Sequence, residues 1–116
     1  MATVNPTRSS PSSADADIVI WAGIVTDDTV TPIELTDTRG AVSSIQISGT
    51  FNGGTTAVLQ VSNDNTTWFT GTDTLGEDVS ATANAFFELS VTSRYARMSV
   101  TSGSSDSITA VLVMRG

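Results

Sequence analysis

The sequence lacks three residue types on which much enzyme chemistry depends. Its 116 residues include no Cys, no His and no Lys, so every positive charge is an Arg. Without Cys there is no disulfide and no thiolate. Without His and Lys the chain lacks the commonest general base, the commonest metal ligand and the usual Schiff-base nucleophile. We therefore predict a protein that is not an enzyme and that uses no cofactor and no metal.

Basic segments and long apolar runs are scarce as well. The formal net charge is −7, and an acidic surface repels phosphate backbones and anionic lipids. No apolar run approaches the length needed to cross a bilayer. The composition therefore predicts neither nucleic-acid binding nor membrane binding.

What the chain has in abundance is Ser and Thr, about 30% of its residues, together with short apolar runs of period two. β-Branched side chains fit a pleated surface, and strict alternation indicates a half-buried strand. Strands are predicted at residues 17–25, 30–35, 41–51, 55–62, 66–71, 86–91, 95–101 and 108–114, with Pro32 marking an edge strand or the start of a strand. We therefore predict an all-β, antiparallel two-sheet sandwich, jelly-roll-like, with about eight strands.

The alternation also predicts which side chains face the core. These are Ile45, Ile47, Phe51, Ala57, Leu59, Val61, Phe87, Leu89, Val91, Ala96, Met98 and Val100. Residues 1–16 are rich in Ser, Pro and Ala without an apolar period, and such a segment cannot offset the cost of its own ordering. We predict a flexible N-terminal arm at residues 1–16 and the sandwich at 17–116. Within the arm, Asn5, Pro6, Thr7 and Arg8 are candidates for contact with a partner.

The first and last predicted strands, "IVIW" and "ITAVLVM", lack polar alternation. Either both strands are central and covered by loops, or their outer faces meet another subunit. For the second case the candidate interface residues are Val19, Trp21, Val111 and Val113.

Two polar side chains, Tyr95 and Arg97, are predicted on the outer face of a single strand. Arg97 could pair with a carboxylate of a partner, or with a cross-strand neighbour such as Glu88 within the domain.

The segment "SNDNTTW" has the composition of a tight turn, because Asn and Asp cap their own backbone; Trp68 would then cover the open end of the hairpin. The loop carboxylates are Asp27, Asp28, Asp73, Glu77, Asp78 and Asp106. Acidic loops are usually solvated, although Asp73 with Glu77 and Asp78 is the best candidate for a bound ion. None of them has the spacing of an EF-hand loop.

A family resemblance follows from these signals. The strand pair "ISGTFNGGTTAVLQVSNDNTTW", the acidic loop, "RYARMSVTSG" and a closing strand ending in Arg115 together resemble the small β-sandwich head decoration, or cement, proteins of tailed bacteriophages. The resemblance covers residues 18–116. It implies a virion protein, made in the host cytoplasm, that binds the outer surface of the major capsid protein lattice. It also implies a homo-oligomer that bridges neighbouring capsid subunits and stabilises the head.

Two alternatives belong to other functional classes. "VSNDNTTW" followed by "RYARMSV" is similar to the discoidin-type sandwich, which implies a glycan-binding module on a virion surface or tail. The chain lacks the Cys pair of that family and the Gly expected where Asn65 stands. Such a lectin would lose binding when Trp68 or Tyr95 becomes Ala. A small hydrolase that uses two carboxylates is the third possibility, and it would need both groups in one cleft.

Overall fold

The computed structural model describes residues 2–9, 16–35, 42–89 and 93–115, and its regular elements in these ranges are all strands. They are β1 (Thr3–Val4), β2 (Thr7–Ser9), β3 (Ala16–Ile24), β4 (Thr29–Val30), β5 (Ile33–Glu34), β6 (Val42–Thr50), β7 (Thr56–Ser62), β8 (Phe69–Thr70), β9 (Ser80–Ala81), β10 (Ala85–Leu89), β11 (Tyr95–Thr101) and β12 (Ser107–Arg115). The all-β prediction is confirmed. Within the described ranges no helix has the length and hydrophobicity needed to span a membrane.

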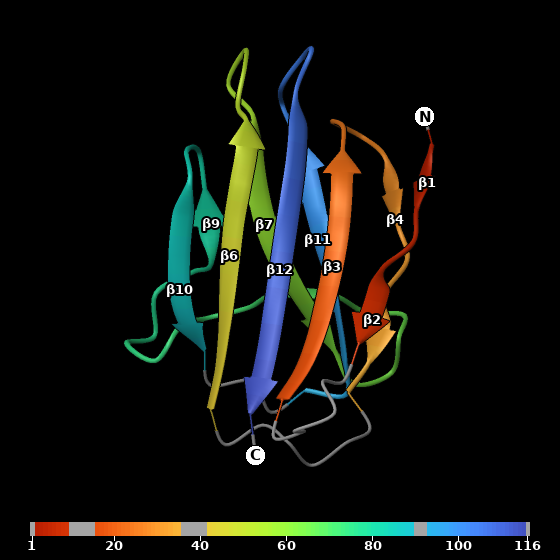
Figure 1. The fold of residues 1–116 in the computed structure, drawn as a ribbon, viewed down its shortest axis with the longest axis vertical. Helices are drawn as coiled ribbons and strands as arrows, with labels where there is room; N and C mark the ends of the chain where they lie inside the picture. The colour runs from red at the N-terminus through yellow and green to blue at the C-terminus, as the bar shows by residue number, and fades with distance from the viewer. Residues whose placement is uncertain (1, 10–15, 36–41, 90–92, 116) are drawn as a thin grey trace.

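The strands form two sheets packed face to face (Figure 1). The first sheet has the order β10-β6-β12-β3-β2. The second has the order β5-β11-β7-β8, with β9 also paired to β7. All pairs within these two sheets are antiparallel, so the predicted antiparallel sandwich is confirmed. A separate pair, β1 with β4, is parallel.

The strands outnumber the eight predicted because several are very short. The predicted strand at 30–35 is split into β4 and β5 around Thr31 and Pro32, since Pro has no N–H to donate to a ladder. β5 is an edge strand, as the position of Pro32 predicted. β1, β2 and β9 are pairings of two or three residues that carry too few residues for a recognisable period.

The core lies between the two sheets and is built by alternate residues of each strand. In β11 the burial alternates strictly from Tyr95 to Val100, because successive side chains point to opposite faces. The fully buried large side chains include Trp21, Ile24, Ile45, Ile47, Leu59, Met98, Ile108 and Leu112. Of the predicted core residues, Phe51, Val61 and Phe87 are half-buried against this cluster and Val91 lies outside the described residues; the others are buried.

The N-terminal segment is paired with the domain where the structure describes it. β1 runs beside β4, with Thr3 opposite Thr29, and β2 adds an edge strand to β3, with Arg8 opposite Val19. Residues 3–4 and 7–9 therefore differ from the predicted flexible arm, because their backbone groups complete sheet ladders. Residues 10–15 of the predicted arm lie outside the described residues.

A buried carboxylate forms hydrogen bonds to neighbouring loops at one end of the sandwich. Asp106, only 5% exposed, accepts hydrogen bonds from the backbone N–H and the hydroxyl of Thr26 and from the hydroxyl of Thr55. The Thr26 hydroxyl is the main reason why the pKa of Asp106 lies below its usual value. A Cβ at Gly103 would overlap both the Thr55 hydroxyl and this carboxylate, so only Gly fits there. Asp106 is thus a structural group that joins three loops.

Candidate functional site

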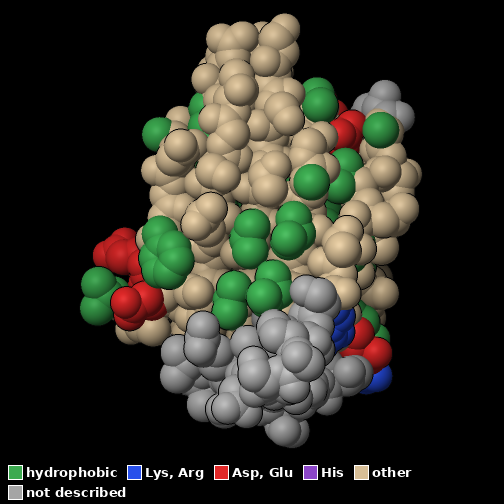
Figure 2. Space-filling view, viewed as in Figure 1, with side chains coloured by type: hydrophobic (Ala, Val, Ile, Leu, Met, Phe, Trp, Pro, Cys, Tyr) green, Lys and Arg blue, Asp and Glu red, His purple; other side chains and the backbone are tan. Residues whose placement is uncertain are grey.

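The outer surface of the first sheet carries the clearest concentration of apolar side chains outside the core. We call Ile18, Ile20, Val111 and Val113 the apolar face. Val111 is opposite Ile20 and Val113 is opposite Ile18, so the four form a block on β12 and β3. All four are half-buried. Figure 2 shows hydrophobic side chains gathered in the middle of this surface.

Polar residues surround the apolar face on the same sheet. Across the strands, one row runs from Phe86 on β10 through Gln46, Val111 and Ile20 to Thr7 on β2. Phe86 is 63% exposed at the end of this row. An apolar centre with a polar margin is the composition of many protein-binding surfaces.

Two of the predicted interface residues do not belong to this surface. Val19 and Trp21 are completely buried, and Val19 is opposite Leu112 in the core. The Trp21 indole N–H donates to the backbone carbonyl of Thr31 at 2.9 Å. The prediction that they share an outer face with Val111 and Val113 is therefore wrong. β12 lies between β6 and β3, and β3 lies between β12 and β2, so both strands are central, as the first explanation requires. Contact of their outer faces with another subunit stays a prediction.

The outer surface of the second sheet is polar and carries Arg97. The guanidinium of Arg97 lies 4.1 Å from the centroid of the Trp68 ring, and its Nε donates to Gln60 Oε1 at 2.8 Å. Arg97 is directly opposite Gln60 in the β11–β7 ladder. A cross-strand partner inside the domain was predicted, but Glu88 was the wrong residue because it belongs to β10, in the other sheet.

A second Arg–aromatic contact lies nearby on this surface. Arg94 forms an exposed ion pair with Glu34 at 2.7 Å and lies over the Tyr95 ring, 5.4 Å from its centroid. The hydrogen bond to Glu34 raises the pKa of Arg94. Tyr95 is half-buried beside it. The predicted pair Tyr95 and Arg97 therefore does share the outer face of β11.

Beside Arg97 lies a hollow of about 190 Å³. It is lined by Asp28, Thr29, Val30, Gln60, Arg97, Met98 and Ser99. The two Asp28 oxygens accept the backbone N–H groups of Ala2 and Val25, at 3.0 and 2.9 Å, and these bonds lower the pKa of Asp28. The hollow therefore contains one positively charged group, Arg97, and one carboxylate, Asp28, whose oxygens already accept backbone N–H groups. Sequence reasoning did not find this hollow.

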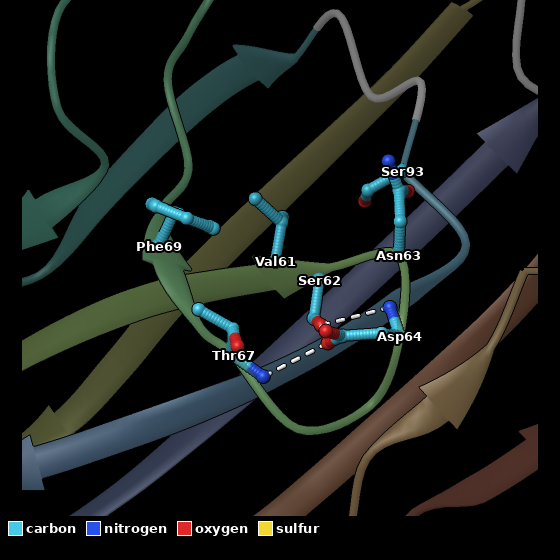
Figure 3. A pocket seen from close by; sticks show the side chains of 7 residues that line it. All are labelled: Val61, Ser62, Asn63, Asp64, Thr67, Phe69 and Ser93. Carbon is cyan, nitrogen blue, oxygen red and sulfur yellow. Dashed lines mark hydrogen bonds between the residues drawn. The ribbon is translucent and has the colours of Figure 1, made fainter.

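The polar segment after β7 is a self-contained turn, as predicted. The Asp64 carboxylate accepts the N–H groups of Thr66 and Thr67 and the Ser62 hydroxyl. Figure 3 shows Asp64 with Ser62 and Thr67. These bonds, that from Thr67 foremost, lower the pKa of Asp64 to about 2. Asn65 adopts a positive φ of 60°, which Asn tolerates. The polar side chains of the turn therefore form hydrogen bonds within the turn itself.

A second hollow, about 210 Å³, lies next to this turn (Figure 3). It is lined by Val61, Ser62, Asn63, Asp64, Thr67, Phe69 and Ser93. Phe69 is 64% exposed and is the aromatic side chain of this hollow. Trp68 instead lies against Arg97, on the sheet surface.

The predicted partner-contacting residues of the N-terminal segment lie along one edge. Asn5 Oδ1 accepts the hydroxyl of Thr31 at 2.7 Å, and Arg8 Nη1 donates to the backbone carbonyl of Glu34 at 3.1 Å. Thr7 faces outward opposite Ile20, and Pro6 connects β1 to β2. Their predicted contact with a capsid stays a prediction.

The acidic loop at residues 72–78 is organised by hydrogen bonds to Asp73. Asp73 Oδ1 accepts the N–H groups of Leu75 and Glu77, at 2.9 and 3.0 Å. Asp78 and Glu77 are exposed. Within the ranges that the structure describes, no three His, Cys, Asp or Glu side chains converge as metal ligands.

No protein-family model matches this sequence, and no curated protein sequence matches it. The functional assignment therefore depends on the surfaces described above.

Proposed function

We propose that this chain is a head decoration, or cement, protein of a tailed bacteriophage. It binds the outer surface of the major capsid protein lattice through its apolar face. The single observation that carries the proposal is the block of Ile18, Ile20, Val111 and Val113 in the middle of this sheet surface, with the polar residues Gln46 and Thr7 on either side. The resemblance of residues 18–116 to decoration proteins points in the same direction.

Attachment to a repeating shell suits a surface of this kind. Burial of each Val or Ile side chain contributes about 1.5–3 kcal/mol at most, so four half-buried residues give a modest contact. A lattice offers the same contact many times, and a protein that bridges neighbouring capsid subunits multiplies it. The net charge of −7 agrees with a location outside the shell, away from packaged nucleic acid. The expected partners are the major capsid protein and further copies of this chain.

The decisive experiment is cryo-electron microscopy of assembled heads, with and without the protein. We expect ordered density for the sandwich on the outer surface, with β3 and β12 facing the capsid. Density inside the shell, or none on the head, would overturn the proposal.

A binding assay tests the face itself. Val111→Asp places a charge in the apolar face, whereas Val58→Asp makes the same change on the outer surface of the other sheet, where Val58 is also half-buried. We expect Val111→Asp to weaken co-sedimentation with undecorated heads by about tenfold or more, because the charge must be desolvated. Val58→Asp should bind as the wild type does. Equal binding of both variants would remove the apolar face from the mechanism.

One observation favours the glycan-binding alternative. Phe69 is exposed beside a hollow that also presents Asn63 and Asp64, and an aromatic ring next to polar groups can stack on a sugar. On this alternative Phe69→Ala abolishes binding to immobilised glycans, while Trp68→Ala and Tyr95→Ala act mainly on the neighbouring Arg side chains. A decoration protein shows no such glycan binding, and its attachment to heads is unaffected by Phe69→Ala.

A further inference from the structure

The guanidinium of Arg97 is held in place before any partner arrives. Its face rests on Trp68 and its Nε is bound to Gln60, which fixes the plane of the group. Within the described part of the chain no carboxylate forms an ion pair with Arg97, and its terminal Nη atoms have no hydrogen-bond partner there. The chain has five basic and twelve acidic residues, so an Arg without a carboxylate is unexpected in it.

A fixed guanidinium beside a hollow suits a carboxylate ligand. The two terminal nitrogens of Arg match a carboxylate in a fork geometry, and less conformational entropy is lost when the side chain is already ordered. Thr29 and Ser99 add polar groups to the lining, whereas Val30 and Met98, which also line it, are buried core residues. Asp28 opposes an incoming carboxylate, although its two oxygens already accept backbone N–H groups.

The complementary group lies on the opposite side of the same molecule. The loop Thr72–Asp78 projects beside β10, whereas β4, which lines the hollow, lies at the other edge (Figure 1). Leu75 is 85% exposed at the tip of this loop. Glu77 and Asp78 are exposed next to it, and the structure gives neither an ion pair with a described Arg.

We infer that a second copy of this chain is the ligand, bound head to tail. The loop Thr72–Asp78 of one copy docks at the hollow of the next, where Glu77 or Asp78 pairs with Arg97, and Leu75, which is exposed in the free chain, is covered by the contact. Among the described residues, Arg97 has no carboxylate partner, and Glu77 and Asp78 have no Arg partner. The two groups lie on different edges, so these complementary charges can meet only between molecules.

A contact of this kind joins two different surfaces. Such heterologous contacts continue from copy to copy, and they close into a ring or extend as a filament. The inference goes beyond the proposed function and does not depend on it, because association of the free protein is measured without any capsid.

The test uses two variants that each lose one half of the contact. Arg97→Gln removes the cation, and Glu77→Gln with Asp78→Asn removes the acidic half while leaving Asp73 to hold the loop. We expect the wild type to self-associate in sedimentation velocity runs at low ionic strength, and to dissociate as salt rises from about 0.05 to about 0.5 M. Each variant alone should associate about tenfold more weakly.

An equimolar mixture of the two variants separates this arrangement from others. Each still has the half that its partner lacks, so one intact contact forms and the mixture stops at a dimer. A wild type that stays monomeric at all concentrations and salt conditions would overturn the inference. So would variants that associate as the wild type does, or a mixture that stays monomeric.

Leu75→Ser tests the apolar part of the contact, with Phe86→Ser as its matched control on the neighbouring strand. Leu75→Ser should weaken self-association and Phe86→Ser should not. The reverse result would place the contact on the first sheet instead. Circular dichroism shows whether each variant is folded, and if Arg97→Gln is not, Arg97→Met replaces it.

Discussion

The outer surfaces of the two sheets differ in the contacts that their side chains make within the chain. On the second sheet, Arg97 is bound to Gln60 and stacked on Trp68, and Arg94 is paired with Glu34. On the first sheet, Val111 and Ile20 lie opposite each other between Gln46 and Thr7, and their own side chains have no polar atoms. The polar side chains of the second sheet therefore have most of their partners within one chain. The apolar side chains of the first sheet would bury more surface if a second molecule covered them. We therefore propose attachment through the first sheet and a narrower, charge-dependent contact through the second.

The largest effect is expected where a side chain belongs to the core and not to either outer surface. Leu112 and Val111 are neighbours on β12, but Leu112 is 1% exposed and Val111 faces outward. Leu112→Ala should lower the free energy of unfolding by about 2–5 kcal/mol, and Val111→Ala by less than about 1.5 kcal/mol. Urea denaturation measures both. A cost at Val111 equal to that at Leu112 would mean that the apolar face is already covered in the free chain.

A smaller effect is expected from the Arg97–Trp68 pair. Arg97→Met, Trp68→Ala and the double variant form a cycle that isolates their interaction. A half-exposed Arg over a Trp ring contributes about 0.5–1 kcal/mol of coupling. The free energies of unfolding of the four proteins give this value. If the coupling is zero, the Trp68 ring does not hold the guanidinium. The claim that Arg97 is fixed before a partner binds would then be wrong.

The local features of both surfaces could be predicted from the sequence. Period two identified the strands and the core residues Leu59 and Met98, because alternation is a property of consecutive residues. The turn built on Asp64 was predicted for the same reason, since its hydrogen-bond donors lie within three residues. Pro32 likewise marked an edge strand through its missing N–H.

The features that depend on strand pairing could not be predicted. Arg97 meets Gln60 because β7 and β11 pair in one register, and no local signal relates these distant strands. The run "IVIW" contains no polar residue, so nothing in it distinguishes the inward Val19 and Trp21 from the outward Ile18 and Ile20. The hollow beside Arg97 also needs β4, whose two residues give no period.

Protonation of Asp64 at low pH should weaken the turn beside the second sheet. The folded-state pKa of Asp64 is about 2, below its usual value of 3.8, so its hydrogen bonds stabilise the protein fully above pH 4. That stability is lost as the pH falls from about 4 to about 2. The pKa of Asp106 is also lowered, so the wild type alone cannot separate the two groups.

The Asp64→Asn variant makes this separation. We expect the difference in thermal midpoint between the wild type and Asp64→Asn to shrink over the same pH range and to be constant above it. A difference that stays constant down to pH 2 would mean that the Asp64 carboxylate is not what holds the turn.

The smallest effect is expected at the ion pair between Arg94 and Glu34. Its side chains are 60% and 37% exposed, so water and salt screen it, and Glu34→Gln should leave the free energy of unfolding almost unchanged. The same change leaves Arg94 without its carboxylate and adds a second unpaired cation to the surface that carries Arg97. If the head-to-tail contact depends on charge, Glu34→Gln should tighten self-association at low salt while hardly changing the unfolding midpoint. Weaker association of this variant would mean that Glu34 itself takes part in the contact. The positive charge of Arg94 and Arg97 would then not be what the second sheet uses to bind the neighbouring copy.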